Sequence, residues 1–162
     1  MKVAPLIRAM RTDDIDAVME VFRASVRLVA RSDYTPEQVL AWSPDDVDAA
    51  AWARRYATRE AWVADIDRIL VGFIELESNG HLDMLYVHPA HQRQGVASAL
   101  LRELEAAARN SGIVTLYNEA SITARPFFES RGFTLIAPQT VALRGQEFVN
   151  FRMEKRLAAA AT

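Results

Sequence analysis

The sequence contains no cysteine, and this absence narrows the chemistry open to the chain. Without thiols the protein cannot form disulfides, hold a metal through thiolates or use a cysteine nucleophile. A net charge of one sign is also lacking, since 19 lysines and arginines stand against 21 aspartates and glutamates, a formal net charge of −2. Such a balance gives no general attraction to nucleic acid, so a polyanionic ligand would need a local binding site.

Long apolar runs are missing as well. No run approaches the roughly 18 residues of a membrane-spanning helix, and the N-terminal sequence MKVAPLIRAMRTDD becomes charged too early for a signal peptide. We therefore expect a cytoplasmic protein without membrane contact. Its 162 residues, 51% of them hydrophobic, suffice for one domain with a core. We place this domain at residues 1–157 and expect residues 158–162, rich in alanine, to form a disordered tail.

Local patterns predict strands and helices in a definite order. Alternating apolar residues and turn signals such as Asn79-Gly80 predict strands and hairpins, whereas apolar residues that recur every three or four positions predict helices. The sequences TPEQ (35–38) and SPDD (43–46) are typical helix starts. The predicted strands cover residues 3–9, 61–66, 69–76, 81–87, 113–119, 133–143 and 147–153. The predicted helices cover residues 12–29, 36–42, 44–57, 96–109 and 122–131.

The stretch from residue 82 to 101 organises the rest of the chain. It reads LDMLYVHPAHQRQGVASALL, which predicts an apolar strand, a polar loop with one glycine, and an amphipathic helix. The N–H groups of such a loop converge, and the helix N-terminus adds a partial positive charge. Glycine at position 95 lets the backbone approach a ligand closely. The stretch therefore predicts an anion-binding site built from backbone.

Two motifs in this region resemble those of the GNAT N-acetyltransferases. The loop sequence QRQGVA (92–97) fits the Q/R-x-x-G-x-G/A motif of that family, and the strand before it ends in LYVHP, as the family's fourth strand typically does. Downstream, SITARPFFESRGF (121–133) is similar to the family's second motif, N-x-x-A-x-x-F-Y-x-x-x-G-F. The phrases DYTPEQ and DMLYVHPAHQ further resemble the YafP-like bacterial branch of the family.

The resemblance implies a fold and a reaction. The expected fold is an α+β single GNAT-like domain, with a mixed, mostly antiparallel sheet of about seven strands flanked by helices. The fourth strand should carry a bulge and splay from the fifth, leaving a gap for the donor. The expected reaction is transfer of acetyl from acetyl-coenzyme A to a primary amine, by direct attack in a ternary complex. No metal is expected, and the lack of cysteine excludes an acetyl-cysteine intermediate.

The resemblance also implies which residues bind the donor. The backbone of the fourth strand should bond the pantetheine amides and polarise the thioester carbonyl, as preorganised donors do in an oxyanion hole. The N–H groups of the loop and the first helical turn should hold the pyrophosphate, with Arg93 as a charge partner. The full set of expected donor-binding residues is Leu85, Tyr86, Val87, Gln92, Arg93, Gln94, Gly95, Val96, Ala97, Ser98, Ser121, Ala124, Phe127 and Phe128.

This chain departs from the family pattern at two positions. Ser121 stands where the second motif has asparagine, and it can still form a hydrogen bond with pantetheine. Phe128 stands where many members have a tyrosine that protonates the departing thiolate, which phenylalanine cannot do. A thiol with a pKa of about 8.5 leaves tolerably without full protonation. Phe128 nevertheless favours an alternative function, a coenzyme A-binding regulatory or interaction protein on a degenerate GNAT scaffold.

An amine acceptor also requires a base, because alkylammonium groups are protonated near pH 7. Asp83 interrupts an apolar strand and has the same parity as His81, where some GNAT enzymes place a glutamate. We rank Asp83 first as the catalytic base, His81 second and Glu119, near the end of the fifth strand, third. For each of the three, the alternative is a structural role as a strand-end or cross-strand polar residue.

The remaining expectations concern the acceptor, metals and assembly. Tyr34, Trp42 and Tyr117 are the expected substrate contacts, with aromatic packing as their alternative. His88 and His91 lie on a turn without a carboxylate or thiolate to complete a metal site. The acceptor is expected to be a small-molecule or peptide amine, with neither nucleic acid nor membrane as partner. The protein is expected to be a monomer or a homodimer.

Overall fold

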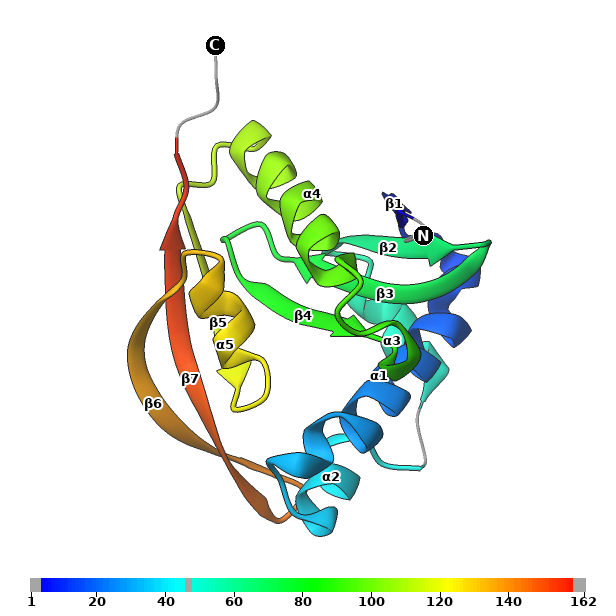
Figure 1. Cartoon of the computed structure of the whole chain (residues 1–162), viewed down its shortest axis with the longest axis vertical. Coiled ribbons are helices and arrows are strands. Elements are labelled where there is room, and N and C mark those ends of the chain that lie inside the picture. The colour runs from blue at the N-terminus through cyan, green and yellow to red at the C-terminus, as the bar shows by residue number, and fades with distance from the viewer. Residues whose placement is uncertain (1–3, 46–47, 159–162) are drawn as a thin grey trace.

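The computed structural model describes residues 4–45 and 48–158, which form two antiparallel sheets that diverge from one junction (Figure 1). The first sheet has the strand order β1-β2-β3-β4 and the second the order β5-β7-β6. The strands are β1 (Leu6–Ala9), β2 (Glu60–Ile66), β3 (Ile69–Leu76), β4 (Leu82–Val87), β5 (Thr115–Ser121), β6 (Thr134–Leu143) and β7 (Gln146–Arg156). The helices are α1 (Ile15–Leu28), α2 (Pro36–Trp42), α3 (Ala49–Arg55), α4 (Val96–Asn110) and α5 (Arg125–Ser130), with 3-10 turns η1 (Thr12–Asp14), η2 (Ala30–Ser32) and η3 (Pro89–His91).

The predicted order of elements is confirmed, and the fold class with it. The helix predicted over 44–57 is wrong at its start, because the carboxylate of Asp48 accepts a hydrogen bond from the N–H of Ala50 and begins α3 at Ala49. The strand predicted over 113–119 runs two residues later, as β5. The helix predicted over 122–131 begins only at α5, because the hydroxyl of Ser121 accepts from the N–H of Ala124 and holds a turn.

Some predicted elements include residues that the structure does not describe. Val3 of the strand predicted over 3–9, Asp46 and Val47 of the helix predicted over 44–57, and residues 159–162 of the expected tail lie outside the described residues.

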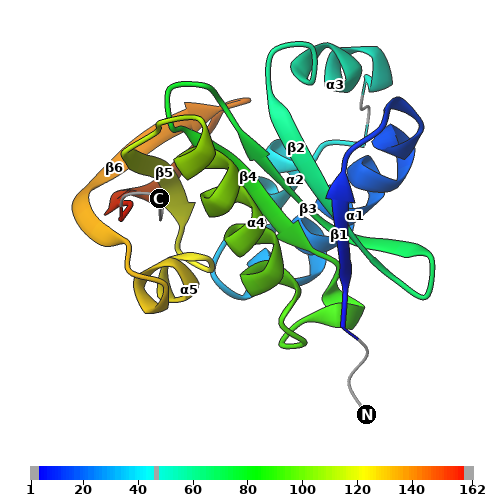
Figure 2. The same cartoon turned by 90° about the horizontal axis from the view of Figure 1, so that it is seen from above.

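Helices cover both faces of the first sheet (Figure 2). One core lies between this sheet, α4 and the second sheet, and the other lies between the opposite face of the first sheet and α1, α2 and α3. Neighbouring strand residues divide between the two cores, as in Val63 and Ala64 or Phe73 and Ile74, because successive side chains point to opposite faces. No helix in the described ranges is long and apolar enough to cross a membrane.

The two sheets meet at a single junction and separate beyond it. His81 and Tyr117 form an isolated parallel bridge, and the N–H of Tyr117 donates to the carbonyl of Gly80 at 3.1 Å. Past this point β4 and β5 diverge (Figure 1). Opposite β3, two residues of β4, Asp83 and Met84, occupy the space of one, which is a β-bulge. The expected bulge and splay are therefore confirmed.

Gly80 is the residue of the junction at which we expect a substitution to cost the most stability. Its φ is +95°, and an added Cβ would lie 2.3 Å from the carbonyl oxygen of Thr115. We expect Gly80→Ala to lower the free energy of unfolding by about 3 kcal/mol, since backbone strain and a clash with backbone add together. Urea denaturation measures this. Gly145→Ala is the matched control, because Gly145 has a φ of +80° but open space at its Cβ, so it should cost only about 1 kcal/mol. Equal losses would contradict the role of the junction.

Candidate active site

A cavity of about 390 Å³ occupies the gap between the diverging strands. Strands β4 and β5 form two of its walls, the β6–β7 hairpin forms a third, and Tyr34 and Trp42 close it. The lining residues are Tyr34, Trp42, Leu82, Asp83, Met84, Leu85, Tyr86, Asn118, Glu119, Ala120, Ser121, Ala124, Phe128, Gln139, Val141, Leu143, Phe148 and Asn150. The bulge bends β4 beyond the junction. Within the described residues β4 and β5 therefore pair only at His81 and Tyr117, and the gap between them stays open.

A second cavity of about 170 Å³ adjoins the first and leads toward α4. Both are lined by one shared set of residues, namely Trp42, Leu85, Tyr86, Ser121, Ala124 and Phe128. The second cavity continues to Val87, Gln92 and Ala97. Nine of the expected donor-binding residues line it, which are Leu85, Tyr86, Val87, Gln92, Ala97, Ser121, Ala124, Phe127 and Phe128.

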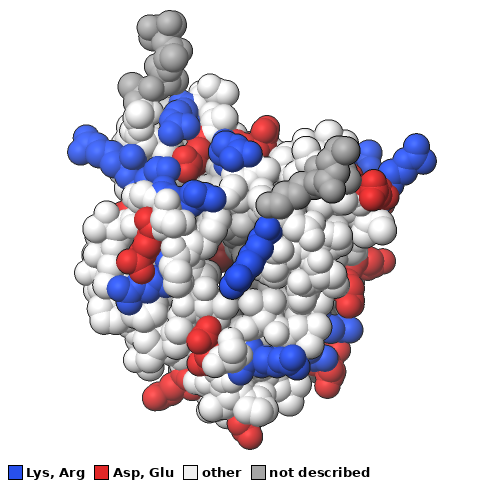
Figure 3. Space-filling model, in the orientation of Figure 1, with Lys and Arg blue, Asp and Glu red and all other residues white. Residues whose placement is uncertain are grey.

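The other five expected donor-binding residues form the loop and first turn of α4. Gly95 starts this helix with a φ of +81°, and no side chain within residues 4–45 and 48–158 caps the helix N-terminus. A Cβ added at Gly95 would meet no atom within 4 Å, so the space beside it is open. These features suit an anion such as a pyrophosphate. On this face lysine and arginine side chains lie beside the hollow between the sheets, with aspartate and glutamate side chains among them (Figure 3).

Contacts hold this loop in place. The side-chain amide of Gln92 donates to the carbonyl of Val87 at 2.7 Å, which fixes the loop against β4. The guanidinium of Arg131 donates to the hydroxyl of Ser98 in the first turn of α4. Arg93 has a φ of +60°, a conformation that turns the loop toward the helix. Val96 is buried, with its side chain packed near Gly72, so only its N–H is suited to bind a ligand.

Asp83 lies in a network of ion pairs. Its Oδ2 accepts hydrogen bonds from Arg55, at 2.7 Å, and from Arg59. Arg55 also donates to Glu75 at 2.7 Å, and Glu75 is fully buried and accepts a further bond from Tyr56. Burial pushes the pKa of Asp83 upward, but the bonds from Arg59 and the charge of Arg55 outweigh it, so the pKa lies below its ordinary value. Asp83 is therefore a weak base.

His81 lies between two carboxylates. Its Nδ1 is 2.6 Å from Oε1 of Glu77, and its Nε2 is 2.6 Å from Oε2 of Glu119. The bond to Glu119, opposed by partial burial and aided by Glu77, raises the pKa of His81 to about 9. His81 is therefore an imidazolium at neutral pH and has no lone pair to accept a proton.

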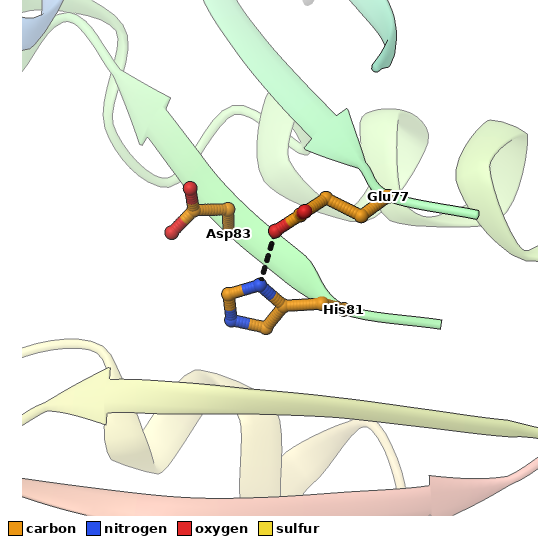
Figure 4. Close-up of side chains that lie close together, drawn as sticks. All are labelled: Glu77, His81 and Asp83. Carbon is orange, nitrogen blue, oxygen red and sulfur yellow. Dashed lines mark hydrogen bonds and ion pairs between the residues drawn. The ribbon is translucent and has the colours of Figure 1, made fainter. Parts of the chain in front are cut away.

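Glu77, His81 and Asp83 approach one another closely enough to suggest a metal site (Figure 4). Their polar atoms are already engaged, because Glu77 bonds to His81 and Asp83 accepts from Arg55 and Arg59. Arg59 also lies 3.6 Å from Glu77. These cations would repel a metal ion, so the cluster is better explained as an ion-pair network.

The raised pKa of His81 has a consequence for stability. The pKa of an unfolded histidine is about 6.5, so the contribution of the charged His81 is complete below that pH and is lost as pH rises through about 9. We expect the free energy of unfolding to fall by about 2 kcal/mol more in the wild type than in His81→Gln between pH 6 and 9.5. Urea titrations at both pH values measure the difference. Parallel pH dependence in the two proteins would contradict it.

The aromatic residues expected to contact substrate lie in different places. Tyr34 and Trp42 line the large cavity, whereas Tyr117 stacks on His81 at the junction, with ring centroids 4.8 Å apart, and is absent from the cavity wall. The hydroxyl of Tyr34 donates to the carbonyl of Val149 and accepts from the N–H of Ile122. Tyr34 therefore offers its ring to the cavity and uses its hydroxyl to brace the second sheet.

Phe128 is buried against two aromatic neighbours. Its ring centroid lies 5.4 Å from that of Phe127 and 5.0 Å from that of Phe133. Because it also lines both cavities, its edge reaches the channel while its body completes the core. Phe128 offers no proton there.

Sequence reasoning missed the amides of the large cavity. Asn118 is only 4% exposed and lines the wall, and neither its Nδ2 nor its Oδ1 has a hydrogen-bond partner among the described residues. Asn150 adds an unpartnered Oδ1, and Gln139 faces it across β6 and β7. A signal was present in the sequence, because Asn118 lies two positions from both Leu116 and Ala120. The three side chains therefore point to the same face of the strand, which is the buried one.

Comparisons with known proteins agree with this architecture. The family model described as an acetyltransferase (GNAT) domain matches residues 30–155. The chain is 38% identical to the N-acetyltransferase YafP of Escherichia coli over 147 residues, which is 91% of this chain and 93% of the relative.

Solved structures show the same fold. A GCN5-related N-acetyltransferase from Rhodopseudomonas palustris is 32% identical and superimposes with a TM-score of 0.92, covering 97% of this chain and 98% of the other. The PaiA N-acetyltransferase of Thermoplasma acidophilum, solved with coenzyme A, is 22% identical with a TM-score of 0.78, covering 95% and 99%. The family match and the relatives that span nearly the whole chain lead to one conclusion: this protein belongs to the GNAT acetyltransferase family.

Proposed function

We propose that this protein transfers an acetyl group from acetyl-coenzyme A to a primary amine, by direct attack in a ternary complex. The observation that carries the proposal is the gap between β4 and β5. Its small cavity leads to the uncapped start of α4, and its large cavity reaches the carboxylates of β4 and β5. Donor and acceptor can therefore enter from different sides and meet between the strands.

The donor supplies an acetyl group activated as a thioester. The backbone of Leu85, Tyr86 and Val87 is suited to the pantetheine arm, and the N–H groups from Arg93 to Ser98 are suited to the pyrophosphate. Relatives of the same fold support this assignment, since PaiA was solved with coenzyme A and a phosphinothricin acetyltransferase from Sinorhizobium meliloti with acetyl-coenzyme A.

Among the three base candidates, Glu119 has the most support. It lines the large cavity, its side chain is 38% exposed, and its Oε1 has no hydrogen bond within the described residues. Asp83 is held by two arginines, and His81 is already protonated. Glu119 accepts the proton of the ammonium group, directly or through water, while His81 fixes its orientation. His81 and Asp83 then act as positioning and charge-balancing residues.

Because Phe128 replaces the tyrosine acid, the alternative function as a coenzyme A-binding regulator must also be tested. A coenzyme A-binding regulator on this scaffold would bind the donor and release no thiol. We expect the thiolate to depart without a tyrosine acid, because its pKa of about 8.5 makes it a tolerable leaving group. The unpartnered amide atoms of Asn118 and Asn150, together with the two carboxylates at the wall of the large cavity, favour an enzyme, since a regulator would have no use for an acceptor site.

One experiment separates the two functions. The protein is mixed with acetyl-coenzyme A and a broad panel of primary amines, and thiol release is followed, with coenzyme A binding measured by calorimetry. Amine-dependent release supports the acetyltransferase. Binding without release across the panel would favour the regulator, and failure to bind coenzyme A would contradict both.

A further inference from the structure

The large cavity has an unusual distribution of charge. Two carboxylates, Asp83 and Glu119, reach its wall, and no lysine, arginine or histidine is found among the described residues that line it. The rest of the wall is aromatic, aliphatic or amide. An anionic group on the acceptor would therefore lose water without gaining a cationic partner.

The ion-pair network beside the cavity carries one uncompensated negative charge. A continuous chain of contacts joins four carboxylates, Glu75, Glu77, Asp83 and Glu119, to three cations, Arg55, Arg59 and His81. His81 counts as a cation because each of its two ring nitrogens lies 2.6 Å from a carboxylate oxygen, so both nitrogens carry a proton and donate it. A single ammonium group in the cavity would bring the local charge to zero.

The amides supply an independent observation. Both side-chain polar atoms of Asn118 are buried at the cavity wall, as is Oδ1 of Asn150, and none of the three has a partner in the part of the chain that the structure describes. Buried amides without partners are rare in folded proteins and cost stability unless a ligand or water bonds to them. An amide offers both a donor and an acceptor without charge. A neutral polar group of the acceptor that reaches these atoms would satisfy them.

We propose that the acceptor is a monocationic amine with an apolar or aromatic body and no anionic group near the amine. Any other polar group on this acceptor is neutral and forms its hydrogen bond with Asn118. This inference rests on the proposed function and names the chemical class of its acceptor. It excludes free amino acids, whose α-carboxylate would lie beside the amine in a cavity where none of the described lining residues is a cation.

Three ligands of nearly equal shape test the charge selection. Phenethylamine lacks any carboxyl-derived group, phenylalaninamide carries a neutral carboxamide, and phenylalanine carries the carboxylate. Their dissociation constants are measured by calorimetry on the full chain saturated with coenzyme A. We expect phenylalanine to bind at least about 10-fold more weakly than phenylalaninamide, which matches it in size. Equal or tighter binding of phenylalanine would overturn the inference, as would failure of all three to bind.

Two matched variants sharpen the test. Val141 and Val149 are both exposed valines of the β6–β7 hairpin, at 37% and 43%, but only Val141 lines the cavity. We expect Val141→Arg to bring in the missing cation and reduce the preference for phenylalaninamide at least about threefold, while Val149→Arg leaves it unchanged. An unaltered preference in Val141→Arg would contradict the charge argument.

The role of Asn118 has its own readout. We expect Asn118→Leu to weaken phenylalaninamide about 10-fold and phenethylamine by less than threefold, with coenzyme A affinity unchanged. Equal effects on the two amines would overturn that role. Because these experiments measure binding, their results do not depend on whether the protein transfers acetyl. Amines that bind as expected but release no thiol from acetyl-coenzyme A would contradict the proposed function and leave the charge selection intact.

Discussion

Replacing Gly95 by alanine is expected to weaken the binding of acetyl-coenzyme A by about 30- to 100-fold, while the protein remains folded. The methyl group would enter the open space beside the start of α4, where the loop N–H groups are proposed to meet the pyrophosphate. Hydrogen bonds to a charged group contribute about 1.5–3 kcal/mol each, so displacing the phosphate from one or two of them accounts for the loss. Calorimetric titration with coenzyme A measures it.

Gly112, at the other end of α4, provides a matched control. Its φ of +78° is close to the +81° of Gly95, and a Cβ there also meets no atom within 4 Å. Alanine at either position thus has a similar backbone cost of about 1 kcal/mol. We expect both variants to lose similar stability and only Gly95→Ala to lose affinity. Equal affinity losses would mean that backbone strain, rather than contact with phosphate, explains the effect.

Features encoded by neighbouring residues were predictable from the sequence. The start of α2 is one, because Thr35 and Gln38 of the predicted TPEQ helix start form a capping box, with bonds of 3.1 and 2.8 Å. The glycine loop before α4 is another, since the predicted strand, glycine and helix follow one another in the structure as β4, Gly95 and α4. The β4–β5 gap itself followed from the family resemblance, and the bulge opposite Glu75 then supplied its local cause.

The chemistry of the site depended on contacts between residues far apart in the chain. Asp83 ranked first as base because a carboxylate in an apolar strand looked available, but Arg55 and Arg59 lie more than 20 positions before it in the sequence. His81 was likewise considered without Glu119, which is 38 positions away. No periodicity records such pairings, because they depend on how β3, β4, β5 and α3 assemble. Strand parity was also unreliable here, since the bulge shifts the alternation along β4.

Glu119→Gln is expected to produce the largest loss of activity, lowering amine-dependent kcat/KM by about 100- to 1000-fold. General-base catalysis contributes about 100- to 10,000-fold, and glutamine cannot accept the proton of an ammonium group. Because glutamine has nearly the same shape, it can keep the contact of Glu119 with Nε2 of His81, so the fold should persist. Affinity for coenzyme A should change by less than threefold. Thiol release over a range of amine concentrations, with parallel calorimetry, measures both quantities.

The variant Asp83→Asn tests whether Glu119, rather than Asp83, is the catalytic base. Asparagine removes the charge that Arg55 and Arg59 share, so we expect a loss of stability of about 2–3 kcal/mol but less than a 10-fold loss of kcat/KM. The effects would then separate, with stability depending on Asp83 and turnover on Glu119. A loss of 100-fold or more in Asp83→Asn, together with near-normal turnover in Glu119→Gln, would assign the base to Asp83 despite its lowered pKa. In that case an amine nitrogen must reach Oδ1 of Asp83, the oxygen that neither arginine contacts.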